Sequence, residues 1–109
     1  MCQKLHGAYG AHSKARKVNI SLTKTEGLGW YKTSDVARRG FCSICGSSLF
    51  WEPFEHEATG IIAGSLDNPT GLKTMGHIFV AEKSDFYEIT DGQPQFEFSS
   101  DGKLVLDYK

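Results

Sequence analysis

The stretch RGFCSICGSSLFW, residues 39–51, decides the fold class because it sets a tight cysteine pair directly before a run of strand-forming residues. Cys42 and Cys45 are three positions apart, a spacing at which two thiolates can hold one tetrahedral zinc ion. Gly46 follows directly, and the backbone after such a pair often needs a positive φ angle, which glycine adopts without steric cost. A closed zinc site takes four ligands, so this pair supplies half of one.

Two other interpretations of the pair stay open. A redox Cys-x-x-Cys motif usually places its nucleophilic cysteine at the start of a helix, which lowers the thiol pKa. Residues 46–51 predict a strand instead, which disfavours a redox role for Cys42 and Cys45. The remaining interpretation is a pair of buried cysteines that binds nothing, since cysteine is among the most often buried residues.

The rest of the chain alternates apolar and polar residues over short runs, with glycine-containing turns between them. This pattern predicts a mainly β protein built from antiparallel sheets. The chain is long enough for one domain and shows no linker or repeat, so we expect a single domain over residues 1–109. The expected strands lie at 18–22, 30–31, 48–54, 61–63, 77–80, 86–89 and 104–108.

Composition excludes several classes of partner. The 12 Lys and Arg residues nearly balance the 13 Asp and Glu residues, which leaves a formal charge of -1 and no electrostatic footprint for nucleic acid. No run reaches the length of a membrane span or a signal peptide, and we expect no membrane partner. An odd count of three cysteines suits metal ligation in a reducing compartment better than disulfides, so we expect a cytoplasmic protein.

Other polar residues offer weaker candidates. Among the four histidines, His77 opens an apolar run and is predicted to be buried with a hydrogen-bond partner or a metal, whereas His56 lies in a charged stretch and is predicted to be solvated. Arg38 and Arg39 are predicted to form a solvated loop pair, or else to grip a carboxylate of a small anionic peptide. The large aromatic residues are predicted to form the core: Trp30, Phe50, Trp51 and Phe54.

Several blocks together resemble the glutathione-dependent formaldehyde-activating (GFA) family, which includes centromere protein V. The stretch CQKLHGA at 2–8 is similar to the end of the family's three-cysteine segment, and RGFCSICGSSLF at 39–50 is similar to its next cysteine segment. Later blocks of the family resemble AGSLD at 63–67, HIFVAEKS at 77–84 and DGQPQF at 91–96. The resemblance covers residues 2–96 in the family's order.

The resemblance implies a β-tent fold and zinc as cofactor. Cys42 and Cys45 would belong to a structural zinc site, and Cys2 to a catalytic zinc site, where it is the candidate catalytic cysteine. The implied reaction joins formaldehyde to glutathione, which makes the protein an S-(hydroxymethyl)glutathione synthase-like carbon–sulfur lyase. Glutathione or a similar small thiol is the implied partner. The sequence identifies no substrate-binding residue.

The chain departs from the family's pattern at its N-terminus. The two ligands that precede Cys2 in the family, and the early Cys-x-Cys that joins Cys42 and Cys45, have no counterpart, so the domain resembles an N-terminally truncated member. This leaves the enzymatic role open. The alternative is a catalytically inactive binding or structural module. We also expect a homodimer that covers open sheet edges, in one version with Cys42 and Cys45 of two chains around one zinc ion.

Overall fold

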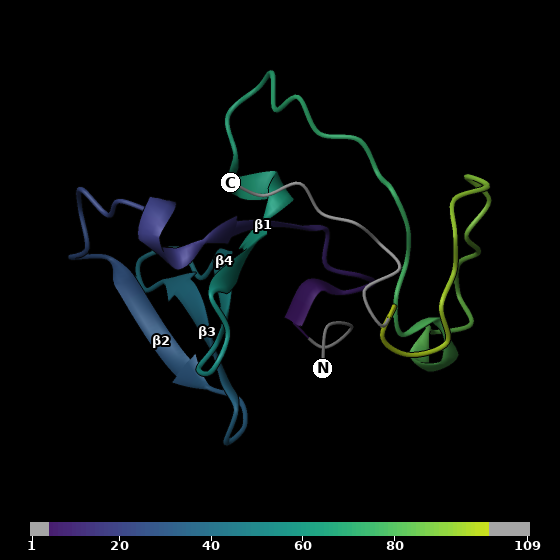
Figure 1. Ribbon diagram of the computed structural model, residues 1–109, viewed down its shortest axis with the longest axis horizontal. Coiled ribbons are helices and arrows are strands. Elements are labelled where there is room, and N and C mark those ends of the chain that lie inside the picture. Colours follow the sequence, from purple (N-terminus) through teal and green to yellow (C-terminus); the bar gives the residue numbers. More distant parts are fainter. Residues whose placement is uncertain (1–4, 101–109) are drawn as a thin grey trace. The chain divides into compact units, whose positions relative to one another are not determined.

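The computed structural model describes residues 5–100 of the 109-residue chain (Figure 1). They fall into two compact units, one formed by residues 11–67 and the other by residues 5–10 and 68–100. Cys2 and the strand predicted at 104–108 lie outside the described residues. A single domain over 1–109 stays a prediction.

A five-stranded sheet forms the unit of residues 11–67 (Figure 1). Its order is β1-β5-β4-β3-β2, and every neighbouring pair is antiparallel. The predicted mainly β, antiparallel fold is therefore confirmed. The strands are β1 (His12–Arg16), β2 (Leu28–Lys32), β3 (Ala37–Cys42), β4 (Ser48–Pro53) and β5 (Ala58–Ile62).

The strand predicted at 18–22 is wrong. A short 3-10 helix, η1 (Lys17–Asn19), stands there instead, and Val18 is 87% exposed. The main-chain N–H of Lys17 donates to the carbonyl of Glu57 at 2.8 Å, which fastens the end of β1 before the chain turns away from the sheet. The alternating pattern could not predict this, because no strand among residues 5–100 pairs with the segment that follows Lys17.

Glycines opposite aromatic rings shape the sheet. Gly40 of β3 pairs in register with Trp30 of β2 and Phe50 of β4, whose rings stack with centroids 6.1 Å apart. A Cβ atom on Gly40 would lie 3.0 Å from both rings, so the close approach requires glycine. Gly29 has the same relation to Phe41, whose ring would meet a Cβ at 2.7 Å.

The core is small, as expected for a sheet with little covering it. Ala37 and Ala58 are 2% exposed and Thr59 is 3% exposed. Three of the four predicted core aromatics are half-buried, but Phe54 is 42% exposed, so its placement in the core was wrong. Phe54 directly follows β4, past the last residue that the sheet can cover.

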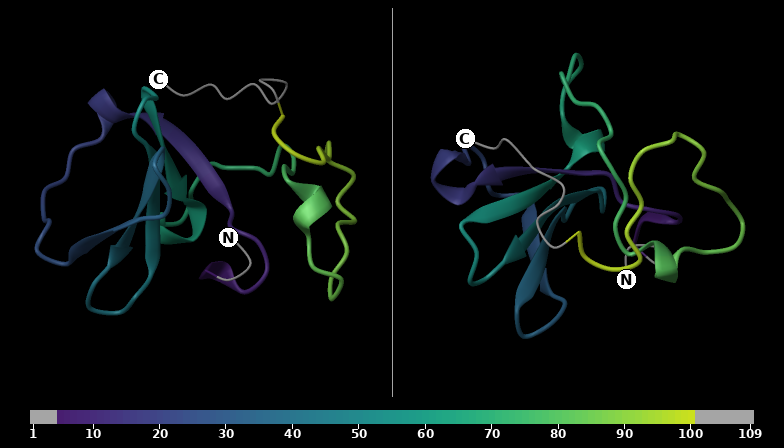
Figure 2. Two further views of the ribbon diagram at one scale, coloured as in Figure 1. Left: turned by 90° about the horizontal axis from the view of Figure 1, so that it is seen from below. Right: turned by 45° about the vertical axis from the view of Figure 1, so that its right-hand side comes forward.

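The second unit contains one 3-10 helix and one isolated β-bridge, and residues 68–100 form no strand (Figure 2). The strands predicted at 77–80 and 86–89 are wrong: His77 forms a single bridge to Gln95, and η3 (Val80–Glu82) follows. Phe79 adopts a left-handed conformation with φ 56°, which ends the extended backbone.

In unit 11–67 another 3-10 turn, η2 (Ala63–Ser65), follows β5.

Candidate functional site

The cysteine pair lies in the turn between β3 and β4. Cys42 is the last residue of β3, and Cys45 lies three residues before β4 begins. The N–H of Gly46 donates to the carbonyl of Cys42 at 2.7 Å, and the N–H of Cys42 donates to the carbonyl of Ser47 at 2.8 Å. Gly46 has φ +82°, so the predicted left-handed glycine is confirmed. A strand follows the pair, as predicted, and not the helix of a redox motif.

A second segment braces this turn. Both the N–H and the hydroxyl of Ser43 donate to the carbonyl of Gly27, at 2.7 and 3.0 Å. Gly27 directly precedes β2, and the N–H of Leu28 closes a turn onto the carbonyl of Thr25. The cysteine turn is therefore held by the β3–β4 hairpin on one side and by the start of β2 on the other.

Hydrogen bonds to sulfur favour the thiolate at this turn. The Sγ of Cys45 lies 3.1 Å from the Oγ of Ser47. The Ser47 side chain lowers the pKa of the exposed Cys45 thiol most, followed by the Ser47 backbone and the Cys42 side chain. Neither Cys42 nor Cys45 is in a disulfide. Since the thiolate is both the nucleophile and the metal-binding form, the turn is suited to either chemistry.

The cysteine spacing and the tight turn suit two corners of a tetrahedral zinc site. Cys42 and Cys45 belong to one turn, closed by the bond from the N–H of Gly46 to the carbonyl of Cys42, which keeps the two residues near each other. Within residues 5–100, no group of three or more His, Cys, Asp or Glu side chains comes together as a metal site would require. The zinc role of Cys2, Cys42 and Cys45 thus stays a prediction, with Cys2 outside the described residues.

The two histidines with sequence predictions, His77 and His56, lie in different units of the structure. In the second unit, the Nε2 of His77 lies 2.8 Å from the Oδ2 of Asp91, and the His77 side chain is 21% exposed. The predicted hydrogen-bond partner is therefore present. The N–H of Gln93 first, and His77 second, lower the pKa of Asp91. His56 is exposed, as predicted, and its Nδ1 accepts the N–H of Ala58 at 3.1 Å.

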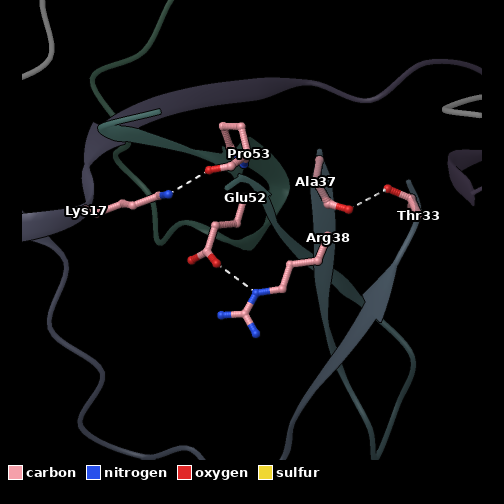
Figure 3. Close-up of polar contacts among 6 residues, drawn as sticks. All are labelled: Lys17, Thr33, Ala37, Arg38, Glu52 and Pro53. Atoms are coloured by element: carbon pink, nitrogen blue, oxygen red, sulfur yellow. Dashed lines mark hydrogen bonds and ion pairs between the residues drawn. The ribbon is translucent and has the colours of Figure 1, made fainter. Parts of the chain in front are cut away.

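The predicted arginine loop is wrong, because Arg38 and Arg39 lie in strand β3. The Nε of Arg38 donates to the Oε1 of Glu52 on β4 at 2.7 Å (Figure 3). The Arg38 guanidinium also lies 3.7 Å from the centre of the Trp30 ring. Arg38 thus grips a carboxylate of its own chain. Arg39 pairs in register with residues on both neighbouring strands.

A pocket of about 130 Å³ opens beside these strands, within unit 11–67. Aromatic rings form part of its wall, and Lys17 and Glu52 bring opposite charges to it. The Nζ of Lys17 donates to the carbonyl of Pro53 at 2.6 Å, which fixes its position (Figure 3). The lining residues are Lys17, Ile20, Leu22, Trp30, Phe50, Glu52 and Thr59.

The sequence analysis missed this pocket, although a signal was present. Phe50 and Glu52 are two positions apart on one strand and so share a face, with Gly40 opposite Phe50. Because Gly40 has no side chain, the strand face that carries Phe50 and Glu52 is left with open space beside it, and this indicates a pocket. Ile20 and Leu22 of the segment after η1, which was predicted as a strand, also line the pocket. The rest of the wall comes from η1, β2 and β5, through Lys17, Trp30 and Thr59.

Comparison with known proteins adds one finding. The family model described as "Glutathione-dependent formaldehyde-activating enzyme" matches residues 1–82 of the 109-residue chain. The matched range contains the cysteine turn, the pocket and all five strands. A comparison with curated proteins gives no match.

Proposed function

The chain belongs to the glutathione-dependent formaldehyde-activating enzyme family, and we propose that it is a zinc-dependent carbon–sulfur lyase acting on adducts of an aldehyde with glutathione or a similar small thiol. In the synthetic direction, the thiol sulfur bonds to the aldehyde carbon while the carbonyl π bond breaks, and the thiol proton moves to the resulting oxygen. The observation that carries this proposal is the family match over residues 1–82.

Zinc is the cofactor that this proposal requires. Cys42 and Cys45 would hold a structural ion, and Cys2 is the proposed ligand and catalytic cysteine of a second site. A zinc ion keeps a coordinated thiol deprotonated at neutral pH, which supplies the nucleophilic sulfur. The tight turn around Gly46 and the serine hydrogen bond to Cys45 support ligation by the first two cysteines.

The pocket offers a place for one end of the thiol substrate. Glutathione ends in an amino-acid group that carries both an ammonium and a carboxylate. Lys17 brings a charge complementary to the carboxylate, and Glu52, whose Oε1 also accepts from Arg38, brings one complementary to the ammonium. Trp30 and Phe50 provide apolar contact. Typical ligand sites hold roughly 300–1,000 Å³, so a pocket of about 130 Å³ suits one end of the peptide.

The test is adduct formation from formaldehyde and glutathione by the purified chain after incubation with zinc. We expect a rate above the uncatalysed reaction, followed by nuclear magnetic resonance, and loss of that excess in Cys2→Ser. Lys17→Ala should raise KM for glutathione and leave kcat unchanged, whereas Lys32→Ala, on an exposed side chain of β2, should change neither. A zinc-loaded chain that never exceeds the uncatalysed rate refutes the proposal.

A second candidate function is a non-catalytic binding or structural module that takes the same thiol ligands. It is favoured by the ligand count, because residues 5–100 bring together only part of a metal site. This candidate expects glutathione binding without turnover, and binding unchanged in Cys2→Ser. In either role we place the protein in the cytoplasm, since the free thiols of Cys42 and Cys45 suit a reducing compartment. Within the described residues, no helix combines the length and apolarity needed to span a membrane.

A further inference from the structure

We propose that Arg38 is a positioning residue that sets the specificity of the pocket: it holds the carboxylate of Glu52 away from Lys17, so that the pocket selects ligands with a free ammonium beside a carboxylate. A ligand whose amino group is blocked should bind weakly. The inference rests on the proposed function for the identity of the thiol ligand, and it names the group of that ligand that the pocket reads.

Two opposite charges line the pocket, and each is tied to a different partner. The Nζ of Lys17 donates to the carbonyl of Pro53 at 2.6 Å, and the Oε1 of Glu52 accepts from the Nε of Arg38 at 2.7 Å (Figure 3). Among the ion pairs of residues 5–100, Glu52 pairs with Arg38 and not with Lys17. Because opposite charges attract, a direct pair across so small a pocket would fill the space between them. The two separate anchors keep that space, and both charges, open to a ligand.

The strand register explains the contacts of Arg38. Arg38 on β3 lies directly opposite Glu52 on β4, and the side chains of such a pair stand on the same face of a sheet. The Arg38 guanidinium also lies 3.7 Å from the centre of the Trp30 ring. Glu52 and Trp30 line the pocket, whereas Arg38 does not. Arg38 therefore acts on a ligand through these two residues.

One oxygen of Glu52 remains available to a ligand. Arg38 bonds Oε1, and the other carboxylate oxygen points away from the guanidinium in Figure 3. An ionised oxygen bonds most strongly to a charged donor, such as a primary ammonium. An acylated amine is neutral and offers fewer donors, and its acyl group must also fit a pocket of about 130 Å³. Glu52 thus distinguishes a free ammonium from a blocked one.

Lys17 reads the carboxylate of the same ligand end. Its ammonium carries N–H donors beyond the one bonded to Pro53, so it can bond a ligand oxygen without leaving its anchor. With Lys17 and Glu52 both fixed, a ligand that carries the two charges on one carbon meets two complementary groups already in place. Groups held before binding lose little conformational freedom on binding, which favours affinity.

The experiment compares two ligands by isothermal titration calorimetry with the full chain. S-methylglutathione has a free ammonium and its N-acetylated form does not, and neither has a thiol that could react or bind a metal. We expect the chain to bind S-methylglutathione about tenfold more tightly, the share expected of one charge-assisted hydrogen bond at a partly exposed site. Equal affinities, or binding of neither ligand, overturn the inference.

Variants assign the preference to its residues. Glu52→Gln keeps the size of the side chain and should abolish the preference, which separates the effect of charge from the bulk of the acetyl group. Arg38→Met should remove most of the preference, and Arg38→Lys should restore part of it. Thr33→Val is the matched control: it removes the hydrogen bond to the carbonyl of Ala37 in the same β2–β3 hairpin and should keep the full preference.

Folding and turnover are measured on the same samples. A folded Arg38→Met chain that keeps the full preference overturns the role of Arg38; if circular dichroism shows that this variant does not fold, Arg38→Lys decides by the same criterion. The ammonium preference in a chain without lyase activity sinks only the proposed lyase. An active chain that binds both ligands equally sinks only this inference.

Discussion

Replacing Gly40 by alanine tests how the sheet builds the wall of its pocket. Gly40 lies on the central part of β3 between two aromatic residues of the neighbouring strands. An added Cβ would approach the Cδ2 of Phe50 and the Cζ3 of Trp30 at 3.0 Å each. The Trp30 ring is held by the Arg38 guanidinium, 3.7 Å from its centre. Turning the Phe50 ring would not relieve the crowding, because the Cβ of Phe50 itself would lie 3.2 Å from the added atom.

The expected cost follows from two opposing terms. Overpacking of this kind costs about 1–3 kcal/mol when side chains must leave their rotamers. Against it, alanine in a strand recovers about 0.5–1 kcal/mol of the backbone entropy that glycine loses on folding. The net destabilisation is therefore about 1 kcal/mol, which lowers Tm by roughly 4 to 8 °C for a domain of this size.

Thermal unfolding followed by circular dichroism measures this shift. Gly64→Ala is the matched control, because a Cβ at Gly64 meets no atom within 4 Å and its φ angle is not positive. We expect Gly64→Ala to leave Tm unchanged or slightly raised. A Gly40→Ala protein as stable as Gly64→Ala would refute the claim that the two rings are held against this glycine.

Three further outcomes follow from the polar contacts. Arg38→Met should destabilise the sheet by about 1–2 kcal/mol in urea unfolding, since it removes a charge-assisted hydrogen bond and a ring contact that are partly exposed. Ser47→Ala should raise the pKa of Cys45 in the metal-free protein, seen as slower alkylation by iodoacetamide at neutral pH; an unchanged rate would dismiss the serine contact. The pKa of Asp91 in the folded protein lies below its ordinary 3.8. The ionised Asp91 carboxylate therefore stabilises the fold fully above pH 3.8, and this stabilisation is lost as the pH falls through the pKa of the folded state. His77→Ala should move that pKa part of the way back toward 3.8 in a carboxylate titration by nuclear magnetic resonance.

Sequence reasoning succeeded where the required information was local. The cysteine spacing, Gly46 and the following aromatic run predicted a tight turn that leads into a strand, and both are present. The strand before the turn, β3, was not predicted. The antiparallel β class followed in the same way from short alternating runs. Each of these features depends on residues within about ten positions of one another, so a single segment carries the whole signal.

The failures have causes that lie outside the alternating pattern. The alternating runs at 18–22, 77–80 and 86–89 have the pattern of strands, but a strand forms only where a neighbour accepts its hydrogen bonds. At Lys17 the backbone bond to Glu57 is the last one that β5 and its preceding turn can offer. Near His77 a partner is present, because carbonyls within residues 94–98 accept N–H groups of residues within 77–81. There the left-handed Phe79 breaks the extended backbone, and only one bridge, between His77 and Gln95, forms. Alternation reports neither the presence of a partner strand nor a local break in the backbone.

The cysteine turn and the pocket are parts of one strand system, which would couple the proposed metal site to the proposed ligand site. Cys42 ends the strand that contains Gly40, and the turn leads directly into the strand that carries Phe50 and Glu52. An ion held at the turn stabilises only the folded hairpin, by an amount that grows with the logarithm of its concentration over its Kd. Because that hairpin forms part of the pocket wall, an ion that stabilises it would also stabilise the placement of Phe50 and Glu52 opposite Lys17. Under the proposed function, zinc at the turn would raise the affinity of the pocket for the thiol, and the thiol would raise the affinity for zinc by the same factor.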